Sequence, residues 1–166
     1  NDVIQAGLSA VSNNSLNVIR LENSGSSYPS FNGSIDSVNY TTNEVTMLGE
    51  LANPEYYVGC GLTVANTSGH IESKKISTVT VNNNGGIYTT VFKLVSGQNL
   101  HSGIGQVSFL VSPYVNITSD SGTLASAYCE VSKASTELLG KISRINVIKF
   151  GGGYKDATIT IESGIG

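Results

Sequence analysis

Residues 141–163 carry strand-like patterns on both sides of three consecutive glycines, and this stretch constrains the fold most strongly. Ile145 and Val147 are separated by one polar residue before the glycines, and Ile159 and Ile161 are separated likewise after them. A period of two places successive side chains on opposite faces of a strand, whereas a helix has a period of about 3.6. The stretch therefore predicts two strands, each with one apolar face, joined by a glycine turn.

The same arrangement occurs at three places in the chain. Each copy has apolar residues twelve, nine and seven positions before a tyrosine, and a glycine three positions before it. Glycine adopts positive φ without a Cβ clash, and the tyrosine ring can cover the turn while its hydroxyl stays in water. Although apolar strands followed by Gly and Tyr are common in β proteins, the matching offsets favour an internally repeated β unit. The predicted turn motif consists of Gly25, Tyr28, Gly85, Gly86, Tyr88, Gly151, Gly152, Gly153 and Tyr154.

Short strand patterns separated by turn residues recur along the rest of the chain. Residues 35–40 and 44–48, for example, are joined by a polar segment and predict a hairpin. Only residues 2–12 place apolar side chains at a helical spacing and suggest a helical turn. We therefore predict an all-β fold, an antiparallel β-sandwich or barrel built from repeated strand–glycine turn–strand units. We expect two such units, residues 1–72 and residues 73–166.

The charge of the chain argues against a nucleic-acid partner, and the length of its apolar runs argues against a membrane-spanning helix. Only 13% of its 166 residues are charged, the formal net charge is −3, and no basic cluster suited to nucleic acid occurs. No apolar run approaches the roughly 18 residues needed to cross a membrane as a helix. The sequence begins and ends in mid-pattern and has neither an initiator Met nor a signal peptide, so we expect it to be part of a longer or processed protein.

Few residues suggest catalysis or ligand binding. Cys60 and Cys129 lie in strand-like segments and are expected to be buried thiols, with a disulfide between them left open. His70 and His101 lie in Ser/Gly-rich loops, where two solvated histidines are expected and a metal-ligand pair is the alternative. Neither a Gly-x-Ser-x-Gly elbow nor a phosphate-binding glycine loop occurs. We predict no catalytic residue, no metal ligand and no cofactor.

The C-terminal third of the chain resembles a module of tailed-phage structural proteins. The segments VSPYVNITSDSGTLASAYCEVS and ISRINVIKFGGGYKDATITIESGIG carry the resemblance, which covers residues 112–166. It is most similar to the baseplate wedge proteins of T4-type, contractile-tailed phages. The resemblance implies an all-β, non-enzymatic virion component that is assembled in the host cytoplasm. It also implies contacts with other baseplate subunits, in a homo- or hetero-oligomer.

Two other functions remain as alternatives. The polar strand faces, rich in Thr, Asn and Ser, suit a carbohydrate-binding, receptor-binding or adhesin module of a tail fibre, with a glycan as ligand. Because Trp is absent, the eight tyrosines would have to supply the aromatic platforms for sugars. A glycan hydrolase would need two carboxyl groups that flank one bond, and no sequence motif places such a pair.

Overall fold

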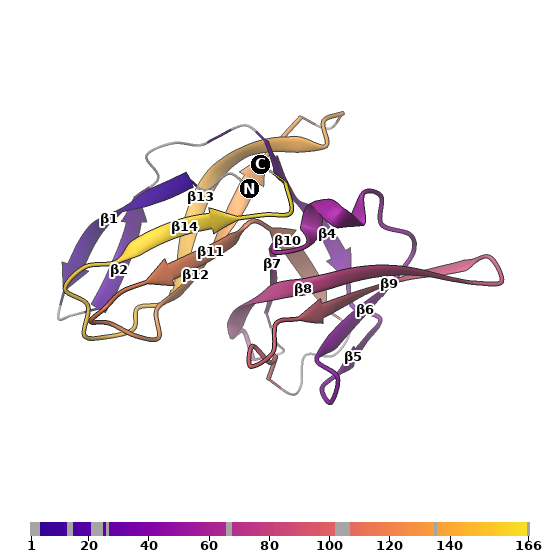
Figure 1. Ribbon diagram of the computed structural model, residues 1–166, viewed down its shortest axis with the longest axis horizontal. Coiled ribbons are helices and arrows are strands. Elements are labelled where there is room, and N and C mark those ends of the chain that lie inside the picture. Colours follow the sequence, from indigo (N-terminus) through magenta and orange to yellow (C-terminus); the bar gives the residue numbers. More distant parts are fainter. Residues whose placement is uncertain are drawn as a thin grey trace.

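The protein is all-β, as its sequence predicts. The computed structural model describes residues 4–12, 15–20, 25, 27–65, 68–101, 107–134 and 136–165. These residues form two antiparallel sheets of seven strands each (Figure 1). Within the described ranges, helical structure is limited to one short 3-10 helix, η1 (Pro54–Tyr57).

Sheet I contains both ends of the described chain. In spatial order it consists of β2 (Ser15–Arg20), β1 (Ile4–Ser12), β14 (Thr158–Glu162), β11 (Tyr114–Thr118), β12 (Ser126–Ser132), β13 (Leu139–Lys149) and β3 (Tyr28–Pro29). The sheet curls, so its edge strand β2 approaches the end of β13. There the Leu16 N–H, at the start of β2, donates a hydrogen bond of 2.7 Å to Phe150 O, just after β13. Its concave side buries a core that includes Leu16, Ile142, Ile159 and Ile161.

Sheet II is formed by the middle of the chain. In spatial order it consists of β4 (Phe31–Ser34), β10 (Ser108–Ser112), β7 (Gly61–Ala65), β8 (Ile71–Asn84), β9 (Ile87–Leu94), β6 (Glu44–Leu48) and β5 (Ser37–Asn39). Its separate core contains four aromatic rings, with neighbouring centroids 5.0–5.9 Å apart, from Phe31, Tyr57, Phe92 and Phe109. Edge-to-face packing of such rings adds to the stability gained by burying them.

Sheet II is inserted between two strands of sheet I. The chain leaves sheet I at Ser30, whose carbonyl accepts a hydrogen bond of 2.5 Å from Lys133 Nζ. It returns at Pro113, whose carbonyl accepts a hydrogen bond of 3.2 Å from the Cys129 thiol. The boundary expected between residues 72 and 73 falls inside β8, and both cores draw on residues from either side of it. The two sheets therefore divide the chain differently from the expected units.

The helical turn expected within residues 2–12 was wrong, because residues 4–12 form strand β1. This strand pairs with β14, where Ile4 lies opposite Ile161, and with β2, where Leu8 lies opposite Ile19. Both pairings satisfy the backbone hydrogen-bonding groups of the segment through partners that the local spacing of apolar residues does not reveal. The predicted hairpin between residues 35–40 and 44–48 is confirmed as β5 and β6.

The three repeat copies form different structures. The second copy is a hairpin, in which β8 and β9 pair directly. In the third copy the strands on either side of the glycines are β13 and β14, which pair with other strands and not with each other. In the first copy, Tyr28 opens the two-residue strand β3, which pairs with β13. The shared sequence pattern thus marks a strand and a turn but does not determine the pairing.

Candidate functional site

The predicted turn residues lie in two different environments. Tyr28 and Tyr154 are buried in the core of sheet I, whereas Tyr88 is 37% exposed beside the turn of the β8–β9 hairpin. The structure therefore does not bring the nine residues together into one site. Positive φ, which the turn prediction requires, occurs at every glycine of the motif except Gly152: at Gly25, Gly85, Gly86, Gly151 and Gly153.

The turn around Tyr154 has a structural role. Its hydroxyl accepts a hydrogen bond of 3.0 Å from the Ala125 N–H, so it is held inside the turn and not kept in water as expected. Thr123 and Gly152 exchange two backbone hydrogen bonds of 3.1 Å each beside it. A Cβ added to Gly122 would lie 2.2 Å from the Tyr154 ring, so the ring packs directly on that glycine. These contacts fasten the β13–β14 connection to the loop before β12.

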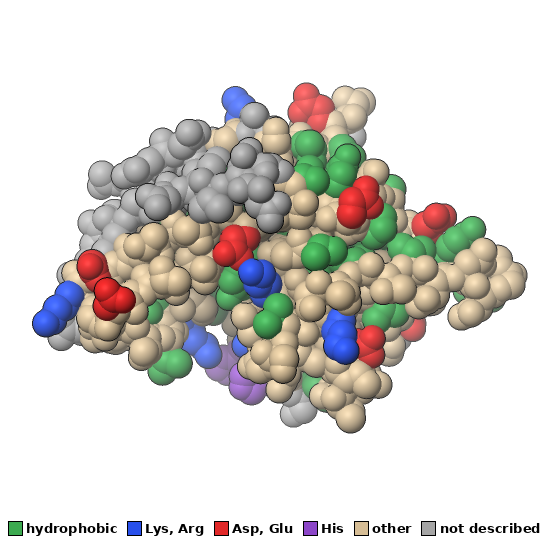
Figure 2. Space-filling view, viewed as in Figure 1, with side chains coloured by type: hydrophobic (Ala, Val, Ile, Leu, Met, Phe, Trp, Pro, Cys, Tyr) green, Lys and Arg blue, Asp and Glu red, His purple; other side chains and the backbone are tan. Residues whose placement is uncertain are grey.

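The β8–β9 hairpin projects from the body of sheet II (Figure 1). Exposed apolar side chains lie near its tip. Ile87 is 68% exposed, Tyr88 37% and Leu48, on the neighbouring strand β6, 65%. Leu48 lies opposite Thr89, and the Gly49 N–H donates a hydrogen bond of 2.9 Å to Tyr88 O. Side chains alternate along β9, so Leu48 and Ile87 share one face of the sheet and Tyr88 points to the other. We call these three residues around the hairpin end the hairpin-tip patch. Apolar side chains gather toward this end of the molecule (Figure 2).

A groove runs between the two sheets. Three hollows of about 240, 370 and 390 Å³ share Ile71 as a lining residue, and two of them share Tyr128. Strand β12 alternates so that Ala127 and Cys129 are buried in the core of sheet I while Tyr128 and Glu130 face the groove. We call these hollows the inter-sheet groove, and its principal lining residues are Asn32, His70, Ile71, Tyr128, Asn146 and Lys149.

One end of the inter-sheet groove contains both histidines. His70 and His101 line the same hollow as Lys149, although 30 residues separate the two histidines in the sequence. The His101 ring contacts Glu72, and its backbone N–H donates to the same carboxylate at 3.2 and 3.3 Å. Glu72 is buried, whereas both histidines are exposed. Among the residues that the structure describes, no group of three or more His, Cys, Asp or Glu side chains is placed to hold a metal ion.

The two cysteines are free, buried thiols, as the sequence predicts. Cys60 lies in the core of sheet II and Cys129 in the core of sheet I. Burial raises the pKa of each thiol to about 12, since a thiolate would lose its hydration. Both thiols therefore stay protonated at neutral pH and act as small apolar side chains.

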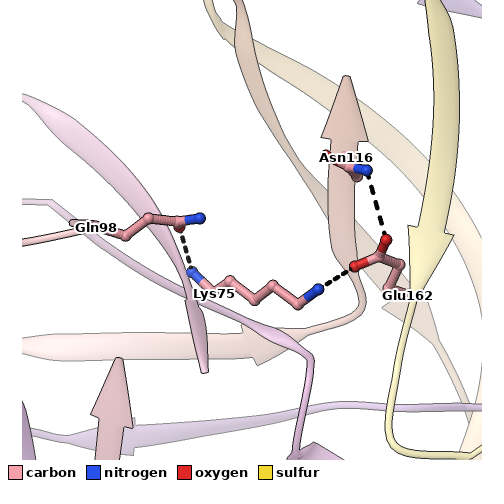
Figure 3. A network of polar contacts seen from close by, with 4 residues as sticks. All are labelled: Lys75, Gln98, Asn116 and Glu162. Carbon is pink, nitrogen blue, oxygen red and sulfur yellow. Dashed lines mark hydrogen bonds and ion pairs between the residues drawn. The ribbon is translucent and has the colours of Figure 1, made fainter. Parts of the chain in front are cut away.

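A polar network also joins the two sheets (Figure 3). Lys75 Nζ on β8 of sheet II lies 2.5 Å from Glu162 Oε2 on β14 of sheet I. The Asn116 side-chain amide donates to the other oxygen of Glu162 at 3.5 Å, and the Lys75 backbone N–H donates to Gln98 Oε1 at 2.8 Å. The Lys75 ammonium also lies 5.7 Å from the centre of the Tyr114 ring. This network helps to fix the orientation of one sheet on the other.

Comparison of the chain with protein-family models, curated proteins and solved structures gives no match. In the described part of the chain, no helix has the length and apolarity needed to span a membrane.

Sequence reasoning missed the groove residues Tyr128, Asn146 and Lys149. The alternation in β12 was a usable signal, because a tyrosine next to a buried cysteine in a strand must face the other side. No comparable signal identified Lys149, since its approach to His70 depends on how the two sheets pack.

Proposed function

We propose that this chain is a non-enzymatic structural component of a phage virion, located in the tail baseplate. It would hold neighbouring subunits together as part of a homo- or hetero-oligomer, assembled in the host cytoplasm. The resemblance of residues 112–166 to baseplate wedge proteins supports this proposal. The low fraction of charged residues, 13%, also supports it, because few charges then need to be desolvated at subunit contacts.

The hairpin-tip patch is the observation that carries the proposal. Ile87, on the arm that projects from sheet II, is 68% exposed, and Leu48, on the adjoining strand β6, is 65% exposed. Full burial of such a side chain stabilises a complex by up to about 1.5–3 kcal/mol. Tyr88 adds a large, rigid ring with a polar end, the kind of residue that is enriched at protein interfaces. The arm is therefore suited to insert its tip into a neighbouring subunit.

The proposal is tested by size-exclusion chromatography with light scattering on the protein alone and mixed with baseplate subunits of the same phage. We expect a stable complex that the double substitution Leu48→Asn and Ile87→Asn weakens. Leu124→Asn is the matched control, because Leu124 is 81% exposed but lies in the loop between β11 and β12, away from the hairpin.

Two results would argue against this function. One is a protein that stays monomeric and forms no complex with any baseplate subunit. The other is a complex that the Leu48→Asn/Ile87→Asn variant forms as tightly as the unaltered protein, which would remove the hairpin-tip patch from the interface.

A further inference from the structure

The inter-sheet groove has features that the structural role does not use. It lies between the two sheets, whereas the hairpin-tip patch lies at the far end of sheet II, so the two surfaces are separate (Figure 1). Its three adjoining hollows provide an elongated site for a chain-like ligand, and ligand pockets typically measure about 300–1,000 Å³. The groove also combines aromatic, amide and charged side chains instead of a purely apolar lining.

Tyr128 and its neighbours provide contacts suited to a sugar. The Tyr128 ring lines two adjoining hollows, where it can pack against the C–H face of a pyranose ring. Asn146, on the neighbouring strand β13, donates from Nδ2 to Glu130 Oε2 at 2.9 Å. This hydrogen bond orients a planar amide and a planar carboxylate side by side, and such groups bind adjacent hydroxyls. Asn32 approaches the same part of the groove from sheet II.

The opposite end of the inter-sheet groove favours an anionic group. Lys149 and His70 line the same two hollows there. The nearby carboxylate of Glu72 is already directed at His101. No ion pair of Lys149 occurs within the part of the chain that the structure describes, so its ammonium remains available to a ligand. Lysine and histidine side chains gather at this margin of the molecule, between the two sheets (Figure 2).

We infer that the inter-sheet groove is a binding site for an acidic oligosaccharide. One sugar ring packs on Tyr128, its hydroxyls bind Asn146 and Glu130, and a carboxylate of the saccharide pairs with Lys149. This activity adds to the proposed structural role and does not depend on it, since no residue of the groove belongs to the hairpin-tip patch.

Isothermal titration calorimetry with defined saccharides tests the site. The acidic probes are tetragalacturonate, a hyaluronan hexasaccharide and an oligosialic acid hexamer, and maltohexaose is the neutral probe. We expect at least one acidic probe to bind and maltohexaose to bind more weakly. Tyr128→Ala should weaken binding about tenfold through the lost ring contact, whereas Tyr128→Phe should keep most of the affinity. Lys149→Ala should weaken binding of the acidic probe about tenfold through the lost charged contact.

Tyr88→Ala is the matched control, because it removes a partly exposed tyrosine from the hairpin and should leave saccharide binding unchanged. Thermal unfolding of each variant verifies that the fold is retained. The inference is overturned if none of the acidic probes binds, or if binding persists unchanged in the Tyr128→Ala variant. Equal affinity for maltohexaose would overturn the assignment of Lys149 to an anionic group.

The two proposed activities fail independently of each other. Tyr128→Ala should weaken saccharide binding about tenfold and leave assembly with baseplate subunits intact. The Leu48→Asn/Ile87→Asn variant should lose assembly and still bind the acidic saccharide. A single substitution that removes both activities would contradict the separation of the two surfaces.

Discussion

Gly151 and Gly85 have the same backbone φ of 64° but different surroundings. A Cβ added to Gly151 would lie 2.4 Å from Thr123 O and 2.6 Å from Ala125 N, in the turn that Tyr154 covers. A Cβ added to Gly85 would meet no atom within 4 Å. Substitutions at these two glycines therefore distinguish the free-energy cost of a left-handed backbone from the additional cost of a steric overlap.

Replacing each of these glycines with alanine should destabilise the protein to different extents. Gly85→Ala should lower the free energy of unfolding by about 1–2 kcal/mol, through its backbone conformation alone. Gly151→Ala should lower it by about 1–3 kcal/mol more, since the backbone around the new methyl group must move. Urea titrations followed by circular dichroism measure both values. Equal losses for the two variants would show that the turn around Gly151 accommodates a methyl group freely.

The β8–β9 hairpin owes its register to its turn. Asn84 lies opposite Ile87, so the loop has two residues, Gly85 and Gly86, with φ of 64° and 92°. Two successive residues with positive φ form the turn whose twist matches that of paired strands. The Asn83 side chain supports the turn, because its Oδ1 accepts a hydrogen bond of 2.8 Å from the Gly86 N–H. The position of Ile87 and Tyr88 at the tip depends on this local geometry.

Gly85→Asn should preserve the hairpin and stabilise it slightly. Asparagine tolerates positive φ and restricts the unfolded chain more than glycine does, so we expect a gain of up to about 0.5 kcal/mol in the free energy of unfolding. Gly85→Val is the contrasting variant, because a β-branched residue at this φ should cost at least about 1 kcal/mol. Thermal melts of the two variants should shift in opposite directions. A loss of stability with asparagine would contradict the assigned turn.

At the scale of the whole molecule, two separate cores are joined by a limited set of contacts. The polypeptide passes between the sheets at Ser30 and Pro113. The C-terminal segment also contacts η1, where the Gly164 N–H donates a hydrogen bond of 3.0 Å to Tyr56 O. A Cβ at Gly164 would lie 2.1 Å from Glu55 O, so the two backbones pack without room for a side chain. The ion pair between Lys75 and Glu162 is a further link, with side chains 33% and 27% exposed.

A double-mutant cycle on Lys75→Ala and Glu162→Ala should show favourable coupling between the sheets. Because both side chains are partly exposed, we expect about 0.5–1 kcal/mol of coupling. This value should fall in 1 M salt, where screening reduces the attraction between the charges. Lys75→Ala combined with Glu137→Ala is the control, since Glu137 is exposed near the start of β13. The losses in the free energy of unfolding caused by these two substitutions should simply add. Additivity in both cycles would mean that the ion pair does not stabilise the junction.

The sequence by itself determined the local structure of this protein. Alternating side chains determined the strands, and glycines determined the turns, because both depend on neighbours within a few residues. Residues 76–94 were therefore predictable as strand, turn and strand. The burial of Cys60 and Cys129 was likewise predictable from their strand-like surroundings.

Only the tertiary structure decided which strands pair and which side chains meet. The partner of β1 is β14, at the other end of the chain, and sheet II interrupts sheet I between Ser30 and Pro113. The inter-sheet groove brings Tyr128 and His70 together through the packing of the two sheets. Any strand with one apolar face can bury it against several others, so the sequence pattern leaves the partner open. The choice is made by the combination of long-range pairings that buries all apolar faces at once and leaves the fewest backbone groups unpaired.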